Sequence, residues 1–141
     1  MRAFHIFILA LFIVASAGCS STPGETQQSG DQITVVMGSA VLDRPEKVQA
    51  LRKYHGIEQM YDYLFNYMNR GAIRQSMKVH VSITEFRLGW GRDMMGIEVN
   101  VTENGEQLKR FHLVDTTGRG SQVKRLTKAL AKRTFAELKE L

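Results

Sequence analysis

Two stretches in which apolar and polar residues alternate strictly constrain the fold of this chain more than any other feature. The first covers residues 77–84 and the second covers residues 95–101. A period of two puts alternate side chains on opposite faces of a strand, so both stretches are predicted to be strands with one buried face. Asn104-Gly105 follows the second stretch and is a strong hairpin signal. With a third strand over Leu108–Val114, these short connections predict an antiparallel meander.

The register of the hairpin at Asn104-Gly105 follows from which side chains must share a face of the sheet. A two-residue turn with regular pairing would place Val99 opposite Arg110 and so mix apolar with charged residues. Shifting the pairing by one residue sets Val99 opposite Phe111 and Ile97 opposite Leu113. Because a shift by one residue moves every side chain to the other face, we predict a three-residue loop or a bulge just after the glycine of the turn.

The segments around the meander show one further strand and two helices. Ile33–Leu42 is predicted to be a strand. Asp43-Arg44-Pro45-Glu46 is typical of a helix start, with Asp43 as the cap, and the helix should end at Gly71 with a kink or break near Gly56. Residues 121–141 form an amphipathic pattern typical of a final helix. The apolar residues expected to pack from the first helix are Val48, Leu51, Ile57, Met60, Tyr61, Leu64, Phe65 and Met68.

The fold class follows from the order of these elements. Phe86 and Leu88 are apolar at the opposite parity to the strand before them, which predicts a bulge near Glu85. The order strand, helix, three strands, helix predicts a β-α-β-β-β-α sandwich of the α+β class. Its sheet should be mainly antiparallel with two helices packed on one face, and residues 32–141 should form a single domain.

The first 18 residues have the pattern of a secretory signal peptide. A positive start is followed by about 13 apolar residues, too few to span a bilayer as a helix. Ala17-Gly18-Cys19 resembles the end of the lipobox of bacterial lipoproteins, which implies lipidation of Cys19 and cleavage before it. Ser16 departs from the usual aliphatic residue, so cleavage after Ala17 by ordinary signal peptidase, giving a soluble protein from Gly18, is the alternative.

The segment after the leader sets the expected anchor and location. Residues 19–31 are predicted to be a lipidated N-terminus and flexible tether, because residues 20–31 contain no large apolar side chain. Cys19 is the only cysteine, so no internal disulfide is possible. Acyl chains on Cys19 would hold the protein at a membrane. Ser20-Ser21 lacks the aspartate expected for inner-membrane retention, so we expect the outer membrane, with the domain facing the periplasm.

Surface features of the predicted fold provide the candidate binding residues. The final helix carries a basic face that could meet an anionic surface, although a merely solvated face fits the same pattern. Trp90 lies between glycines in a predicted turn and could contact a partner, or could fold back over the sheet edge. Tyr63 and Tyr67 on the first helix could line an outer groove or pack in the core. The basic residues of the final helix are Lys124, Arg125, Lys128, Lys132 and Lys139.

No pattern in the sequence indicates catalysis, a metal or a cofactor. His55, His80 and His112 lack metal-like spacing with carboxylates, and no nucleophile turn is present. Residues 115–120 are expected to be a polar loop without the ending of a phosphate loop. The formal charge of +5 favours anionic surfaces only weakly. We therefore expect no catalytic residues, no metal, no cofactor and no nucleic-acid partner.

With these elements placed, the chain resembles small proteobacterial lipoproteins that contain domain of unknown function 4410. The resemblance lies in the leader with its cysteine, in Val81–Phe86, in Ile97–Val101 followed by Gly105 and Leu108, and in the terminal helix. It implies an envelope lipoprotein with a compact domain and no known catalytic residues. We therefore expect a non-catalytic accessory or docking subunit with an envelope protein partner, or alternatively a binding module for an anionic lipid or glycan.

Overall fold

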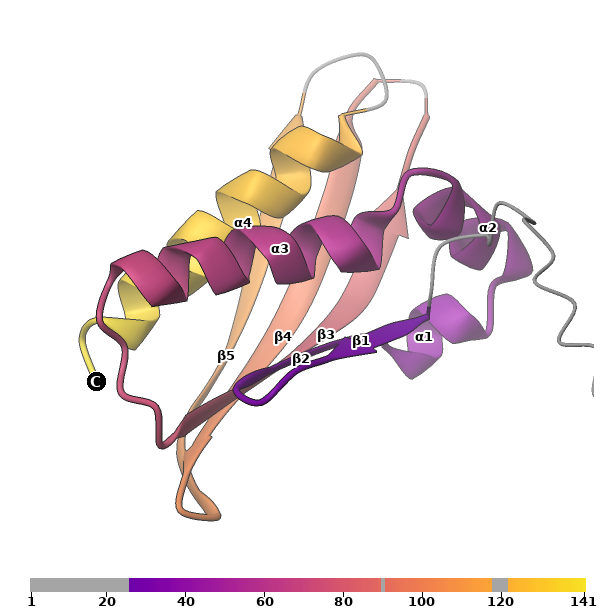
Figure 1. Cartoon of the computed structure of the whole chain (residues 1–141). Coiled ribbons are helices and arrows are strands. Elements are labelled where there is room, and N and C mark those ends of the chain that lie inside the picture. Colours follow the sequence, from indigo (N-terminus) through magenta and orange to yellow (C-terminus); the bar gives the residue numbers. More distant parts are fainter. Residues whose placement is uncertain (1–25, 90, 118–121) are drawn as a thin grey trace, which may run out of the picture.

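A computed structural model of the chain describes residues 26–89, 91–117 and 122–141 (Figure 1). Five strands form one sheet in the order β1-β2-β3-β4-β5. The strands are β1 (Gln27–Ser29), β2 (Ile33–Met37), β3 (Met77–Arg87), β4 (Asp93–Glu103) and β5 (Glu106–Thr117). The helices are α1 (Ser39–Leu42), α2 (Pro45–Lys53), α3 (Gly56–Arg70) and α4 (Val123–Leu138).

The architecture confirms the predicted α+β class with a mainly antiparallel sheet. Strands β3, β4 and β5 form the antiparallel meander, and β1 pairs antiparallel with β2. Among the described strands, only β2 and β3 pair in parallel, and the connection through α1, α2 and α3 makes this pairing possible. Helices α3 and α4 lie beside each other across one face of the sheet (Figure 1). The opposite face of the sheet is left uncovered by helices in the described part of the chain.

The predicted register of the meander is confirmed, including both irregularities. Val99 lies opposite Phe111 and Ile97 opposite Leu113. The turn has two residues, and both adopt the left-handed conformation that a tight hairpin of this kind needs, with φ of 51° at Asn104 and 83° at Gly105. The shift is made by a bulge, since Thr102 pairs with Gln107 and Val101 with Lys109, leaving Leu108 unpaired. A second shift lies between Ile83 and Glu85.

The core lies between the sheet and the two long helices. The alternating side chains of β2, β3 and β4 supply one side, and the inner stripes of α3 and α4 supply the other. The break between α2 and α3 is also confirmed: His55 has a φ of 52°, and Gly56 begins α3. The largest fully buried side chains are Phe86, Ile33, Leu51, Ile57, Met60, Leu64, Met77, Ile83, Met95, Ile97, Leu126 and Leu130.

The N-terminal half of the domain differs from the prediction in three places. The polar segment expected to be a tether through residue 31 contains β1, because backbone groups of Gln27–Ser29 pair with β2. The strand expected over residues 33–42 ends at Met37, since the chain turns into α1 directly after Gly38, whose amide makes a last bond to the carbonyl of Ile83 on β3. Asp43 does not cap α2: it ends α1, and the N-cap of α2 is Arg44, without a side-chain hydrogen bond.

The C-terminal half differs in two smaller ways. Residues 115–117, expected to begin a polar loop, continue β5, because Met95, Met94 and Asp93 of β4 pair with them. The final helix is shorter than residues 121–141, and Leu141 beyond it is 36% exposed instead of packing on the core. The polar side chains of residues 115–117 therefore do not end β5. The strand continues because β4 offers backbone partners as far as Asp93.

Candidate functional site

The basic face predicted on the final helix lies on the outer side of α4. Its five cationic side chains are all exposed and fall within an arc of roughly 100°, at 100° per residue. Leu126 and Leu130 lie on the opposite side of the helix, which is buried. The structure thus brings the predicted residues together on one surface. We call this surface the basic face, and its members are Lys124, Arg125, Lys128, Lys132 and Lys139.

The charge of the basic face is little compensated by its own helix. Residues 123–136 contain no aspartate or glutamate. Glu137 lies 2.6 Å from the ammonium of Lys109 on β5, and this hydrogen bond raises the pKa of Lys109. Within the described part of the chain, Lys124, Lys128 and Lys132 form no ion pair. The surface can therefore attract an anionic group without first losing an internal partner.

Lys139 of the basic face and the nearby Arg133 each contact another group in the described part of the protein, unlike the central lysines. The Lys139 ammonium lies 5.1 Å from the ring centroid of Phe135, and that ring stacks on Tyr67 of α3 at 5.8 Å. Arg133, which the sequence analysis did not single out, donates from Nη1 to the carbonyl of Val114 at 2.7 Å. The hydrogen bond satisfies a backbone acceptor of β5, which is an edge strand of the sheet that the described residues form. Arg133 therefore has a structural partner that the central lysines lack.

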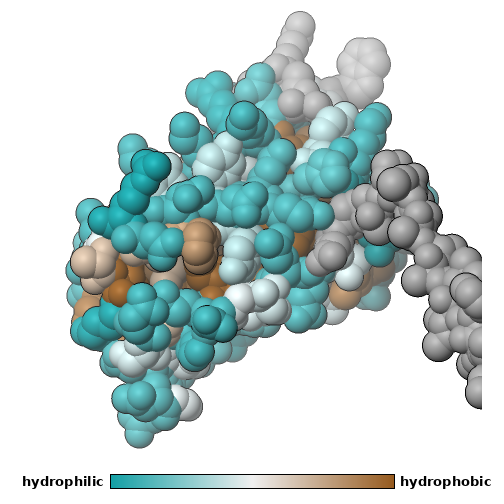
Figure 2. All heavy atoms as spheres, viewed as in Figure 1, coloured by the Kyte–Doolittle hydropathy of each residue, from teal (hydrophilic) through white to brown (hydrophobic). Residues whose placement is uncertain are grey.

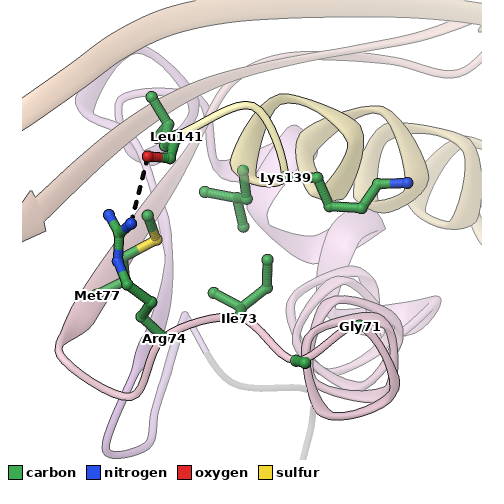
Figure 3. Close-up of a pocket in the computed structure, with 8 residues that line it drawn as sticks. Gly71, Ile73, Arg74, Met77, Lys139 and Leu141 are labelled. Carbon is green, nitrogen blue, oxygen red and sulfur yellow. Dashed lines mark hydrogen bonds between the residues drawn. The ribbon is translucent and has the colours of Figure 1, made fainter.

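A cavity of about 350 Å³ lies at the C-terminal end of α4 (Figure 3). Ile73 points into it, whereas Lys139 points away from it. Arg74 borders the cavity and donates to the main-chain oxygen of Leu141 at 3.3 Å. The lining residues are Gly71, Ala72, Ile73, Arg74, Met77, Leu138, Lys139 and Leu141.

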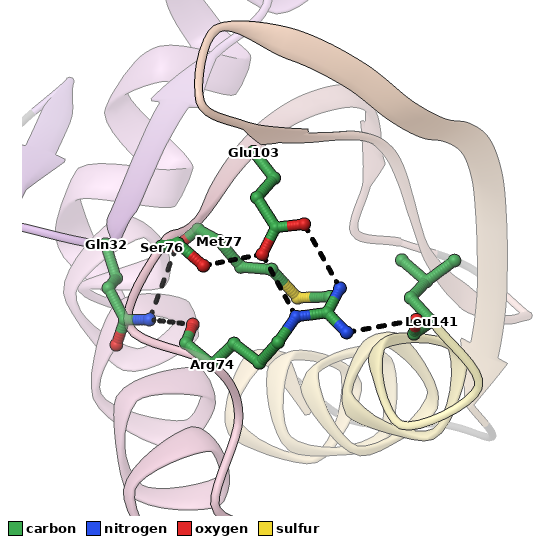
Figure 4. A network of polar contacts seen from close by, with 6 residues as sticks. All are labelled: Gln32, Arg74, Ser76, Met77, Glu103 and Leu141. Atoms are coloured by element: carbon green, nitrogen blue, oxygen red, sulfur yellow. Dashed lines mark hydrogen bonds and ion pairs between the residues drawn. The ribbon is translucent and has the colours of Figure 1, made fainter.

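A polar network beside this cavity joins four segments far apart in the sequence (Figure 4). Arg74 Nε lies 3.0 Å from Glu103 Oε1, and its Nη2 lies 3.3 Å from Oε2. The hydroxyl of Ser76 donates to Glu103 at 2.5 Å, and this bond, together with Arg74, lowers the pKa of Glu103. Gln32 donates to the carbonyls of Arg74 and Met77. Because the guanidinium is already paired, we interpret the network as a structural clamp.

A second hollow, of about 290 Å³, lies between α3 and the turn that connects β1 to β2. Figure 2 shows hydrophobic residues gathered in this part of the surface, below the C-terminal half of α3, on a face that is otherwise largely hydrophilic. The expectation that Phe65 packs in the core is wrong, since it is 46% exposed. It borders the hollow together with Tyr61. Leu64, one position earlier, takes the buried place on α3.

The remaining predicted residues fall into two groups. Tyr63 and Tyr67 are half-buried and pack against the core, and the stacking of Tyr67 on Phe135 leaves no open groove there. Cys19 and Trp90 lie outside the described residues, so their predicted roles stay predictions.

Titratable groups on the described residues do not gather into a reactive cluster. No group of three histidine, cysteine or acidic side chains there is placed to hold a metal ion. On the open face of the sheet, Thr84 Oγ1 lies 3.2 Å from His112 Nε2, and Arg110 pairs with both oxygens of Glu98 at 2.9 Å. These contacts are exposed and lie on a flat sheet surface. None of the described helices is both long enough and apolar enough to cross a membrane.

Comparison with known proteins shows similarity at the level of the fold. No family model and no curated protein matches the sequence, so the resemblance to domain of unknown function 4410 has no family match behind it. A candidate lipoprotein from Caulobacter crescentus CB15 is 16% identical, with a TM-score of 0.46 over 75% of this chain and 86% of its own. A point variant of PelC from Paraburkholderia phytofirmans, solved as a dodecamer, is 14% identical, with a TM-score of 0.51 over 83% of this chain and 94% of its own. The chain thus shares its fold with PelC.

Proposed function

We propose that this protein is a non-catalytic, lipid-anchored subunit of the bacterial envelope that docks onto an acidic surface of a larger envelope assembly. The observation that carries the proposal is the basic face of α4. Its central lysines are exposed, are evenly spaced by one helical turn, and lie on a helix whose other side is fully used by the core. Complementary charge of this kind steers association and selects partners.

The leader supports the anchor in this proposal. Ala17-Gly18-Cys19 supplies the small residues and the thiol that lipidation requires, and two or three acyl chains hold a protein stably where one does not. Between Cys19 and β1, the chain can reach at most about 3.5 Å per residue. The domain would therefore work within a few tens of ångströms of the membrane, which we propose to be the outer membrane, on its periplasmic side.

The shared fold supports the assembly in this proposal. PelC has this fold and forms a dodecamer in its crystals, so the fold is compatible with presentation of many copies in one complex. A domain of this size with an exposed charged helix fits a docking role better than a catalytic one. No described cluster places a nucleophile beside a base and an orienting group, as catalysis of acyl transfer would need.

A second candidate function uses the same face to bind an anionic lipid or an anionic glycan. Lysine supplies compact charges on flexible stems, which suit phosphates or carboxylates whose positions vary. Each cation near an anionic membrane surface contributes about 1 kcal/mol. The two candidates differ in whether a protein partner is needed for the interaction.

The experiment that tests the proposal begins with the full-length protein in intact envelopes. Cross-linking, gentle solubilisation and mass spectrometry are expected to recover one protein partner in a near-equal amount. The triple variant Lys124→Glu, Lys128→Glu and Lys132→Glu should lose the partner, and Cys19→Ala should lose the membrane. Recovery of the same partner by the triple variant, or turnover of a substrate by the purified protein, would contradict the proposal.

A matched control separates position from total charge. The variant Arg44→Glu, Arg87→Glu and Arg92→Glu changes the net charge by the same amount at exposed positions outside α4. It should keep the partner. If no protein is recovered, flotation with vesicles of phosphatidylglycerol, against vesicles of phosphatidylcholine, tests the second candidate. Binding to the anionic vesicles that disappears only in the α4 triple variant would favour the lipid interpretation over the assembly.

A further inference from the structure

The hollow beside α3 is bordered by two aromatic rings, of which Tyr61 is half-buried against the core and Phe65 is exposed. Tyr61 and Phe65 are one helical turn apart, and their rings are nearly parallel, with an interplanar angle of 12° and centroids 6.0 Å apart. Phe65 is 46% exposed, although neighbouring apolar residues on α3 are fully buried. Two stacked rings hold each other in one orientation, and we call this pair the aromatic platform.

The border of the platform consists mainly of uncharged groups that form hydrogen bonds. Asn69 and Gln75 are exposed amides, and each amide offers both donors and an acceptor. Asp31 adds a carboxylate, and no lysine or arginine is among the described residues that line the hollow. Within the same set, Ile33 is the only aliphatic residue. The full lining is Gly30, Asp31, Gln32, Ile33, Tyr61, Phe65, Asn69 and Gln75.

The wall of the hollow is fixed before any ligand binds. A β-carbon added to Gly30 would lie 2.0 Å from the hydroxyl oxygen of Tyr61, so the β1–β2 turn can press against this ring only because residue 30 is glycine. The amide of Gly30 donates to the carbonyl of Ile33 at 2.8 Å and closes the turn. Lys78 donates to the main-chain oxygen of Asp31. A preformed wall lowers the ordering cost of binding.

We propose that this hollow binds an uncharged hexopyranose unit of a glycan. The C–H face of a sugar ring packs on an aromatic ring, while its hydroxyl groups need donors and acceptors around the edge. The hollow offers this combination, and its volume of about 290 Å³ suits one sugar ring. An acyl chain would need a longer apolar groove, and a phosphate would need a cation in the lining. The site lies on α3, apart from the basic face, and does not depend on the proposed function.

The test uses the full-length protein in a neutral, non-sugar detergent and titrates it with uncharged hexasaccharides of glucose or N-acetylglucosamine. Two-dimensional NMR should show shifts at the side-chain amides of Asn69 and Gln75, with saturation in the millimolar range. Phe65→Ala should weaken binding about tenfold or more, and Phe65→Trp should retain it. Because alanine favours helix and Phe65 is exposed, the variant should stay folded.

Controls make each outcome decisive. Leu42→Ala removes another exposed apolar side chain, 48% exposed and outside the hollow, and should bind as the unmodified protein does. The charge reversal of Lys124, Lys128 and Lys132 should leave saccharide binding unchanged, which distinguishes this site from the basic face. The proposal is overturned if no hexasaccharide shifts these amides, if Phe65→Ala binds with unchanged affinity, or if a dispersed short-chain diacyl lipid gives the shifts and saccharides do not.

Discussion

Replacing Gly71 with alanine is expected to destabilise the domain when Phe135 is present and to stabilise it when Phe135 is absent. A β-carbon at Gly71 would lie 2.1 Å from Phe135 Cζ and 2.3 Å from its Cε2, well inside contact distance. The ring cannot move away freely, because it stacks on Tyr67 at 5.8 Å and carries the Lys139 ammonium above it. The substitution therefore forces α3 and α4 apart or breaks the stack at their C-terminal ends.

The magnitudes follow from two opposing effects. Overpacking of a well-filled contact costs about 1–3 kcal/mol. The backbone at Gly71, with φ of −95° and ψ of 7°, is one that alanine adopts without strain. Once Phe135→Ala removes the ring, the same substitution should stabilise by about 0.4–1 kcal/mol, because alanine restricts the unfolded chain. The remaining contact, 3.1 Å to the main-chain oxygen of Tyr67, needs only a small shift.

The assay is urea unfolding of the unmodified protein, the two single variants and the double variant, followed by far-ultraviolet circular dichroism. Equal slopes against urea would allow the midpoints to be compared as free energies of unfolding. The effect of Gly71→Ala should change sign between the two backgrounds, giving a coupling energy of roughly 1.4–4 kcal/mol, the difference between the cost and the gain. An equal cost in both backgrounds would refute the argument, because the Phe135 ring would then not be what requires glycine.

Three further predictions concern the clamp, the hairpin and the core. The bond from Ser76 lowers the pKa of Glu103, so stability should be lost as the pH falls below the ordinary value of 4.5, and Glu103→Gln should flatten that dependence in denaturant titrations. Gly105→Ala should cost about 1–2 kcal/mol in the same assay, because φ is 83° there; an unchanged midpoint would argue against the two-residue turn. Ile97→Ala should lower the free energy of unfolding by about 2–5 kcal/mol, since Ile97 is fully buried, whereas Gln107→Ala at an exposed position should change it by less than about 0.5 kcal/mol.

Periodicity in the sequence predicted much of the sheet because it reports which side chains share a face. The requirement that Val99 and Ile97 face apolar partners was enough to predict a three-residue loop or a bulge just after Gly105, and the structure has the bulge, at Leu108. The same reasoning placed the cations of α4 on one exposed surface, because a helix of 3.6 residues per turn brings positions four apart together. Lys124 and Lys128 are such a pair.

Local patterns failed where a distant partner decided the conformation. Gln27–Ser29 are polar and carry no strand signal, yet they pair with β2 because its edge leaves backbone groups to satisfy. Val41 is apolar and continues an apolar run, yet it lies in α1. The strand before it ends at Met37, and the amide of Gly38 donates to the carbonyl of Ile83. Neither outcome is visible to an analysis that reads a window of neighbouring residues.

The sequence by itself determined the alternating strands, the register of the meander and the basic face of the final helix, because each depends on spacing within one segment. Only the tertiary structure decided the clamp of Arg74 with Glu103, 29 residues apart, and the hollow in which Gly30 meets Tyr61. The tertiary structure also decided that Phe65 is exposed, since Leu64 occupies the buried position on α3. The physical reason is that packing between segments selects one side chain among several that the helical pattern allows.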